Sequence, residues 1–147
     1  MNILFVCTGN LYRSQAAEAF AIANGLPKKY KFDSAGLSEN SAKGKAVPRK
    51  LVDVLATRFL VDFPEGKKSK QLTSELTDWA SVIAYMQPSH RTQLLDLGIS
   101  SKKIVFLGEY ALPPIPKKIP DLAFTSDRLE FENVLGLIQH CVNRMFW

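Results

Sequence analysis

The residue types needed for covalent chemistry on phosphorus occur together near the amino end, in the stretch Cys7-Thr8-Gly9-Asn10-Leu11-Tyr12-Arg13-Ser14. Cys7 offers a nucleophilic thiol, and Arg13 carries a planar guanidinium that pairs well with phosphate oxygens. A thiolate inside a phosphate-binding loop can attack phosphorus and accept the phosphoryl group as a covalent thiophosphate. The spacing of these residues therefore predicts nucleophilic phosphoryl chemistry centred on Cys7.

This stretch connects a predicted strand to a predicted helix. Residues 2–6 form a short apolar run that favours a buried strand, and residues 14–24 are Ala-rich and favour a helix, with Pro27 among the residues that end it. A loop of this kind points several backbone N–H groups at one spot, where the helix dipole adds partial positive charge. We therefore expect the loop to bind an anion and to favour the thiolate form of Cys7. Ser14 would either cap the helix or give its hydroxyl to that thiolate.

A buried structural cysteine at the end of a strand is the alternative interpretation of Cys7. That interpretation explains the cysteine alone. It does not explain why Gly9, Asn10, Arg13 and Ser14 follow at these spacings. We therefore favour the nucleophile.

Strands and helices alternate along the rest of the chain. The predicted strands are residues 2–6, 30–34, 81–86 and 103–107, and the predicted main helices are residues 14–24, 48–57, 88–97 and a long one from 126 or 127 to about 144. This alternation predicts a three-layer α/β/α fold with a central, doubly wound sheet of four parallel strands, in the flavodoxin-like order 2-1-3-4. The length of 147 residues suits a single domain.

An acidic residue is expected at the same edge of the sheet as Cys7. Ligands of such sheets bind beyond the carboxyl ends of the strands. The Cys7 loop follows the first strand, and the proline-rich segment 112–121 follows the fourth, so both emerge at that edge. Asp121 ends this segment, and an acid placed there could protonate a leaving oxygen as it departs from phosphorus. The alternative for Asp121 is a turn residue after Pro120.

The run from Val6 to Ser14, followed by Ala17-Glu18, resembles the signature of the low-molecular-weight protein tyrosine phosphatases. The resemblance continues through Asp33-Ser34-Ala35-Gly36, Lys70-Gln71-Leu72 and Ile119-Pro120-Asp121, and so spans nearly the whole chain. It implies one phosphatase domain over residues 1–147. It also implies hydrolysis of phosphotyrosine in proteins through a cysteinyl-phosphate intermediate, without a metal or an organic cofactor.

The resemblance also implies individual roles. Cys7 would be the nucleophile, Arg13 the phosphate clamp and Asp121 the general acid and base, while Ser34 would support the phosphate loop. The residues that would bind phosphate or substrate are Thr8, Gly9, Asn10, Leu11, Tyr12, Arg13 and Ser14. In the family the general acid is normally followed by a proline and one or two aromatic residues.

Several positions depart from the family pattern. Leu122 replaces the proline after the general acid, and Phe124 is the only nearby aromatic residue. Gln15 stands where the family usually has proline, and Gln87 stands where an acidic residue is more common. Lys67 falls near a histidine that braces the phosphate loop in some members, and we expect it to be a surface lysine.

Leu11 bears on the choice of substrate. Relatives that act on phosphoarginine carry a threonine at this position, whose hydroxyl can meet a guanidinium. An aliphatic Leu11 instead suits the flat face of a phosphotyrosine ring, for which Tyr12 and Phe124 could form the walls of a deep slot. The sequence therefore favours phosphotyrosine, with a phosphoarginine phosphatase as the alternative.

Two other functions remain open. Arsenate reductases of the same fold need two further cysteines to relay a disulfide, and only Cys141, expected in the core of the last helix, is available. A phosphate-binding module without turnover is the other alternative, because Gln15 and Leu122 depart from the family.

Composition bounds the partners and the compartment. The chain is 46% hydrophobic and 22% charged, as in soluble globular proteins, and no segment approaches the ~20 apolar residues of a membrane span. Two cysteines and no evident secretory signal lead us to expect a cytoplasmic protein. The net charge of +5 comes from small lysine groups without interleaved aromatic residues, so we do not expect a nucleic acid as partner, and we expect no membrane partner either. The partner that the resemblance implies is a phosphotyrosine-containing protein or peptide.

Overall fold

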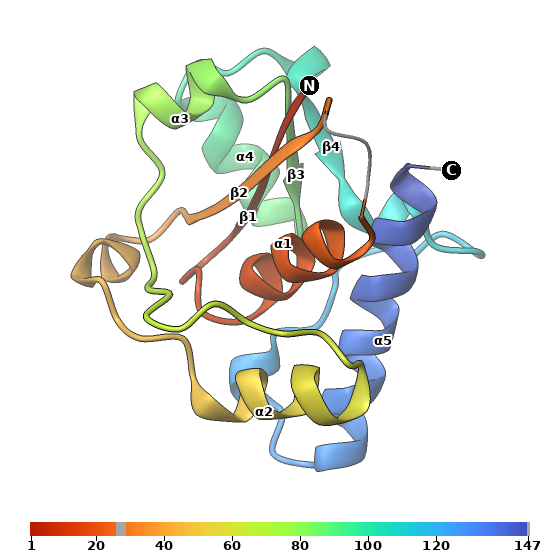
Figure 1. Cartoon of the computed structure of the whole chain (residues 1–147). Helices are drawn as coiled ribbons and strands as arrows, with labels where there is room; N and C mark the ends of the chain where they lie inside the picture. Colours follow the sequence, from red (N-terminus) through yellow and green to blue (C-terminus); the bar gives the residue numbers. More distant parts are fainter. Residues whose placement is uncertain (26–28, 147) are drawn as a thin grey trace.

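The computed structural model describes residues 1–25 and 29–146 and contains a four-stranded parallel sheet (Figure 1). Its strands are β1 (Asn2–Cys7), β2 (Lys31–Gly36), β3 (Val82–Tyr85) and β4 (Ile104–Phe106), in the order β2-β1-β3-β4. The order predicted from the sequence is therefore confirmed. β1 is central and buried from Ile3 to Cys7, which explains its continuous apolar run.

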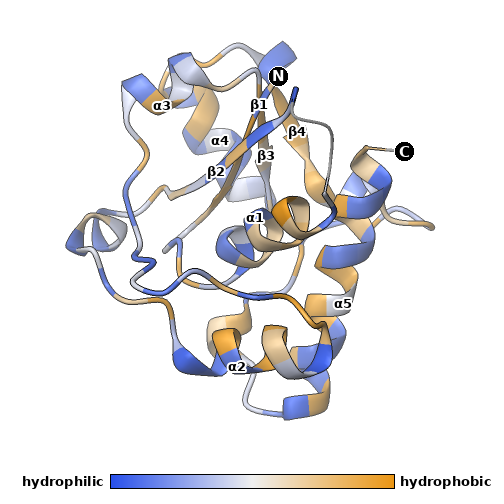
Figure 2. Ribbon diagram, in the orientation of Figure 1, coloured by the Kyte–Doolittle hydropathy of each residue, from blue (hydrophilic) through white to orange (hydrophobic). Residues whose placement is uncertain are grey.

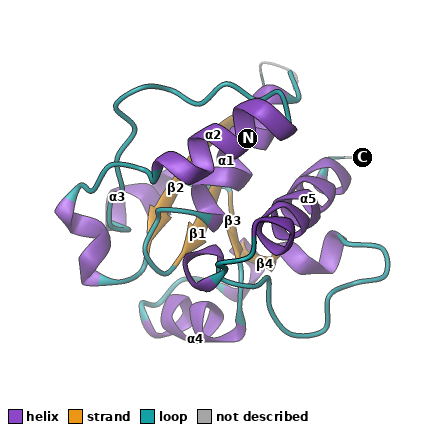
Figure 3. Cartoon of the chain, turned by 90° about the horizontal axis from the view of Figure 1, so that it is seen from below, coloured by secondary structure: helices purple, strands orange, loops and turns teal. Residues whose placement is uncertain are grey.

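Helices cover both faces of the sheet, as the predicted three-layer fold requires. The α-helices are α1 (Arg13–Ala23), α2 (Arg49–Arg58), α3 (Ser74–Trp79), α4 (Pro88–Asp96) and α5 (Arg128–Met145). The short 3₁₀ helices are η1 (Glu39–Lys43), η2 (Ser101–Lys103), η3 (Leu107–Tyr110) and η4 (Leu122–Phe124). Seen from below, α1, α2 and α5 lie on one side of the sheet and α4 on the other (Figure 3).

The observed boundaries lie close to the predicted ones. α1 begins at Arg13, one residue before the predicted start, and Pro27, expected to help end it, lies outside the described residues. β2 runs to Gly36 because its pairing with β1 continues until Cys7 meets Gly36. α5 alternates hydrophobic and hydrophilic residues along its length (Figure 2), and Cys141 lies buried on its inner side, as predicted.

The strand order creates one crevice at the carboxyl ends of the strands. The next strand along the chain, β2, pairs with one edge of β1, while β3 pairs with the other edge of β1. The order of the strands reverses between β1 and β3, which is where open α/β sheets bind ligands. Residues 8–12 after β1 and residues 86 and 87 after β3 emerge at this point.

Within the described residues, no helix has both the length and the apolar composition needed to cross a bilayer.

Two glycines provide a matched test of the packing. A Cβ on Gly36 would lie 2.5 Å from Ser41 Cβ and 3.0 Å from the Thr8 carbonyl oxygen, so Gly36→Ala should destabilise the protein by about 1–3 kcal/mol. A Cβ on Gly136, inside α5, meets nothing within 4 Å, so Gly136→Ala should stabilise by about 0.5–1 kcal/mol through the helix propensity of alanine. Urea unfolding of both variants measures this. An unchanged or raised midpoint for Gly36→Ala would contradict the close packing at Gly36, and a lowered midpoint for Gly136→Ala would contradict the open space at Gly136.

Candidate active site

The residues predicted for chemistry line one pocket of about 290 Å³ at the carboxyl end of β1. Its lining consists of Cys7, Thr8, Gly9, Leu11, Tyr12, Arg13, Ser38, Asn40, Lys45, Asp121, Ala123 and Phe124. Of the predicted site residues, Asn10, Ser14 and Ser34 do not line the pocket and lie buried. Ser38, Asn40 and Lys45 were not identified from the sequence, because nothing in their loop resembles a binding motif.

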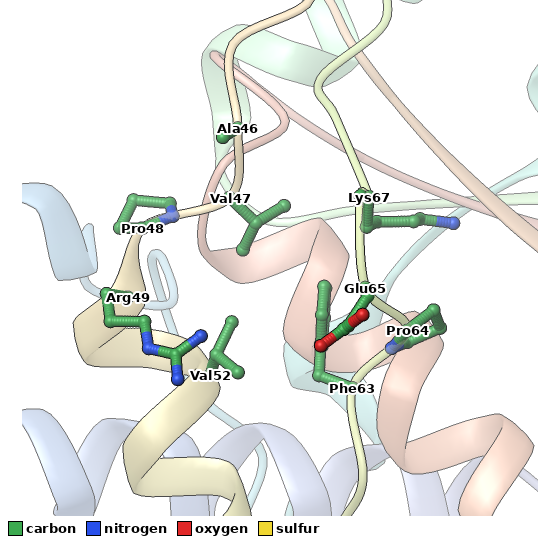
Figure 4. A pocket seen from close by; sticks show the side chains of 10 residues that line it. Ala46, Val47, Pro48, Arg49, Val52, Phe63, Pro64, Glu65 and Lys67 are labelled. Carbon is green, nitrogen blue, oxygen red and sulfur yellow. The ribbon is translucent and has the colours of Figure 1, made fainter.

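A larger hollow of about 620 Å³ lies elsewhere, between the start of α2 and residues 63–67 (Figure 4). Arg49 and Glu65 approach it from opposite walls. Among the described residues that line it there is no cysteine, serine, threonine or histidine. The smaller pocket therefore contains the predicted nucleophile, Cys7, and the larger one is lined by apolar residues with Arg49, Glu65 and Lys67.

The sulfur of Cys7 is hydrogen-bonded to Ser14. Cys7 Sγ lies 3.0 Å from Ser14 Oγ, and Asn10 Nδ2 donates to the same oxygen over 2.8 Å. Because Asn10 supplies a donor to Ser14 Oγ, the hydroxyl hydrogen of Ser14 is free to point at the sulfur. α1 has no side-chain cap at Tyr12, so of the two functions expected for Ser14 the structure shows the contact with Cys7.

A buried hydrogen-bond network supports the loop from beneath. Asn10 has a φ of 54°, in the left-handed region where asparagine is tolerated, and its Nδ2 also donates to Ser34 Oγ over 3.0 Å. Ser34 Oγ donates to Glu18 Oε1 over 2.6 Å. The backbone N–H of Lys70 donates to Asn10 Oδ1 over 3.0 Å. The buried side chains of Asn10, Ser34 and Glu18 thus connect the phosphate loop to α1 and β2.

The prediction that Lys67 is a surface lysine is wrong. Lys67 Nζ lies 2.7 Å from Glu18 Oε2, and only 25% of the lysine side chain is exposed. Glu18 is buried, and a buried carboxylate is costly unless it is paired and hydrogen-bonded. Lys67 therefore supplies the counter-charge that allows Glu18 to accept from Ser34.

Gln15 contributes to the same network through its amide nitrogen. Gln15 Nε2 donates to Asn10 O and Oδ1 over 3.2 and 3.1 Å, and to the carbonyl of Lys68 over 3.4 Å. Its Oε1 is buried without a hydrogen-bond partner. The glutamine that replaces the family's proline thus adds contacts to Asn10 and leaves one acceptor unsatisfied.

Arg13 is a buried cation held from one side by neutral groups. Its side chain is 2% exposed, and Nη1 donates to Gln87 Oε1 over 2.7 Å and to the Ile119 carbonyl over 3.0 Å. Nη2 lies 3.6 Å from Asp121 Oδ2. Gln87 and the Ile119 carbonyl are neutral, and Asp121 approaches only Nη2, so the charge of Arg13 can still attract an anion into the pocket.

His90 supports the pocket through Thr8, although no pattern in the sequence pointed to it. It is fully buried at the start of α4, and the backbone N–H of Met86 donates to its Nδ1 over 3.3 Å. The proton must therefore sit on Nε2, which donates to Thr8 Oγ1 over 3.0 Å. Burial, and then the charge of Arg13, lower the pKa of His90 to about 3, so this imidazole is neutral at physiological pH. The adjacency of β1 and β3 was the feature of the predicted sheet that could have placed His90 beside Thr8.

Asp121 lies at the pocket as the N-cap of η4. Its Oδ1 accepts from the backbone N–H of Ala123 over 3.0 Å, and its Oδ2 faces Arg13. Phe124 is 88% exposed at the pocket and Tyr12 packs edge-on against Phe131, with ring centroids 6.1 Å apart. Both aromatic residues expected as walls therefore line the pocket.

The remaining titratable groups show no further centre in the described part of the chain. No three histidine, cysteine, aspartate or glutamate side chains there lie close enough together to hold a metal ion. Cys141 is free and buried, and burial raises the pKa of its thiol to about 11. A thiol of this kind is a poor nucleophile for a disulfide relay.

Comparison with known proteins adds a family to this geometry. The family model described as low molecular weight phosphotyrosine protein phosphatase matches residues 2–146. No match was found among curated protein sequences.

Solved structures share the fold over almost the whole chain. A low molecular weight protein tyrosine phosphatase from T. tengcongensis has a TM-score of 0.84 at 22% identity, covering 99% of this chain and 97% of that chain. YfkJ from Bacillus subtilis has a TM-score of 0.84 at 28% identity, with 99% and 92% covered. The YwlE arginine phosphatase from Geobacillus stearothermophilus has a TM-score of 0.82 at 25% identity, with 98% and 89% covered.

The lowered pKa of His90 predicts a pH dependence of stability. The unfolded chain takes up a proton on this histidine near pH 6.5, and the folded chain does so only near pH 3. Stability should therefore fall as the pH drops below 6.5, by up to about 1.4 kcal/mol per pH unit from this group. Urea unfolding between pH 7 and 4 should show a shallower decline for His90→Gln than for the wild type, with His140→Gln as control. An imidazole of His90 that titrates near pH 6.5 by NMR would refute the prediction.

Proposed function

The chain belongs to the low molecular weight phosphotyrosine protein phosphatase family, and on this premise we propose that it hydrolyses phosphotyrosine in proteins through a cysteinyl-phosphate intermediate. Family membership supports phosphatase activity. The observation that carries the proposal is that Cys7, Arg13 and Asp121 line one pocket, with Asp121 Oδ2 3.6 Å from Arg13 Nη2.

In the first step, Cys7 Sγ as a thiolate attacks phosphorus in line with the tyrosine oxygen. The S–P bond forms while the P–O bond breaks, and the electron pair leaves on the tyrosine oxygen. Asp121 in its protonated form gives a proton to that oxygen. The hydroxyl of Ser14, 3.0 Å from the sulfur, supports this step because it can donate to the charged thiolate.

In the second step, Asp121 as a carboxylate takes a proton from a water molecule that attacks phosphorus. The S–P bond breaks, inorganic phosphate leaves, and the thiolate is restored. In both steps the guanidinium of Arg13 and the backbone N–H groups of the loop from Thr8 to Arg13 hold the equatorial oxygens. The contacts of Arg13 with Gln87 and Ile119 support this role, because they fix the guanidinium before substrate arrives.

The lining of the pocket supports an aryl phosphate as substrate. Leu11, Tyr12 and Phe124 offer apolar and aromatic surface around the position where a phosphoryl group would lie. The YwlE structure is described as an arginine phosphatase, so the same fold accommodates another phosphoryl donor. The aliphatic side chain of Leu11 favours phosphotyrosine, because it offers no hydrogen bond to the guanidinium of phosphoarginine.

Replacement of the sulfur tests the nucleophile. Cys7→Ser should lower the hydrolysis of p-nitrophenyl phosphate on the order of 10³-fold or more, because a serine hydroxyl at this position has no equivalent thiolate. Binding of inorganic phosphate or vanadate, measured by calorimetry, should remain. Cys141→Ser, which changes the buried cysteine of α5, should keep wild-type activity.

Two results would count against this assignment. Substantial turnover by Cys7→Ser would exclude Cys7 as the nucleophile. A wild-type protein that binds phosphate but does not hydrolyse any aryl phosphate would favour a phosphate-binding module instead.

Substrate choice is measured with matched peptides that carry phosphotyrosine, phosphoserine or phosphoarginine. We expect the highest kcat/KM with phosphotyrosine. Leu11→Thr should raise the ratio of phosphoarginine to phosphotyrosine hydrolysis by about tenfold, because it supplies a hydroxyl at the pocket. Leu129→Thr, on the exposed surface of α5, is the control. A wild-type preference for phosphoarginine or phosphoserine would refute the proposed substrate.

A further inference from the structure

Residues 121–125, here called the acid segment, form a short turn that is held by hydrogen bonds among its own residues. Within it, the N–H of Ala123 donates to Asp121 Oδ1 over 3.0 Å, and the N–H of Phe124 donates to the Asp121 carbonyl over 3.3 Å. The hydroxyl of Thr125 donates to the same carbonyl over 3.3 Å. These local bonds fix the shape of residues 121–125. They do not determine where the segment sits relative to the pocket.

Contacts with the rest of the protein determine that position. Upstream, the N–H of Ile119 donates to the Met86 carbonyl over 2.9 Å. Leu122, which replaces the family's proline, is 1% exposed and packs into the core. Downstream, the ammonium group of Lys50 on α2 donates to the Thr125 carbonyl over 3.1 Å.

Lys50 makes a second contact that fixes its ammonium group. Its Nζ lies 4.3 Å from the ring centroid of Phe131 in the first turns of α5, within the range of a cation–π interaction. Phe131 is fully buried and packs edge-on against Tyr12 of the phosphate loop. Lys50 therefore connects the far end of the acid segment to a ring that already contacts the loop of Cys7.

We propose that Lys50 is a positioning residue for Asp121, which holds the acid segment against α5 so that the carboxyl group stays at the pocket. This role rests on the proposed function, because it assumes that Asp121 is the general acid. The segment lacks the proline that would stiffen it after the aspartate, so a charge-assisted hydrogen bond from another helix takes over part of the restraint.

Dependence on the leaving group separates this role from a general effect on folding. A general acid matters most when the leaving oxygen is basic, as in phenyl phosphate, and least when it departs easily, as in p-nitrophenyl phosphate. Lys50→Met removes the ammonium group and keeps an unbranched side chain. It should lower kcat for phenyl phosphate by about tenfold and for p-nitrophenyl phosphate by less than about twofold, with KM unchanged.

Three further variants complete the experiment. Lys50→Arg keeps a cation that can donate to Thr125 and should restore most of the activity on phenyl phosphate. Lys102→Met, an exposed lysine in η2 at the amino end of β4, should match the wild type on both substrates. Asp121→Asn should show the same selectivity as Lys50→Met with a larger loss, and adding Lys50→Met to it should cause no further loss.

The outcomes distinguish the inference from the proposed function. If Asp121→Asn selectively slows phenyl phosphate but Lys50→Met slows neither substrate or both equally, Lys50 does not position the acid and this inference alone is wrong. If Asp121→Asn shows no selectivity, the acid assignment fails and the inference fails with it. A further selective loss on phenyl phosphate in the double variant would also overturn it, because Lys50 would then act independently of Asp121.

Discussion

The shape of the phosphate loop, residues 7–14, depends on the hydrogen bonds of the Asn10 side chain. One amide group donates to Ser14 and Ser34 and accepts from the backbone of Lys70, while its own backbone adopts a left-handed conformation. A single residue therefore connects the cysteine loop, α1, β2 and the segment around Lys70. The side chains of Asn10, Ser14 and Ser34 are buried and hydrogen-bonded to one another, and buried polar networks rigidify a structure where their groups are satisfied.

The two sides of the pocket are restrained by different kinds of interaction. The phosphate loop rests on buried hydrogen bonds that end in the ion pair of Glu18 and Lys67. The acid segment has an exposed aromatic residue, Phe124, and is tied to the body by buried Leu122 and the ammonium group of Lys50. In the proposed mechanism, the side that would hold the phosphoryl group is thus the one with more buried hydrogen bonds, and the side that would exchange protons with the leaving group and with water has fewer restraints.

How well each feature can be predicted depends on how far apart in the sequence the interacting residues lie. The alternation of strands and helices and the loop of Cys7 are local patterns, so the sequence reveals them, and the rule for parallel sheets extends this to the edge where Asp121 lies. The contacts of His90, Lys67 and Lys50 join segments far apart in the chain. No periodicity marks them, and a lysine that pairs with a buried carboxylate has the same local signature as one in solvent.

The approach of Asp121 Oδ2 to Arg13 Nη2 bears on how the pocket empties. A buried guanidinium would hold inorganic phosphate as firmly as it holds a phosphoryl group, and strong uniform binding slows the last stage of a catalytic cycle. Once Asp121 has released the proton that it takes from water in the proposed second step, its carboxylate is an intramolecular anion that can replace phosphate beside Arg13 Nη2. The carboxyl group would then serve in product egress as well as in proton transfer.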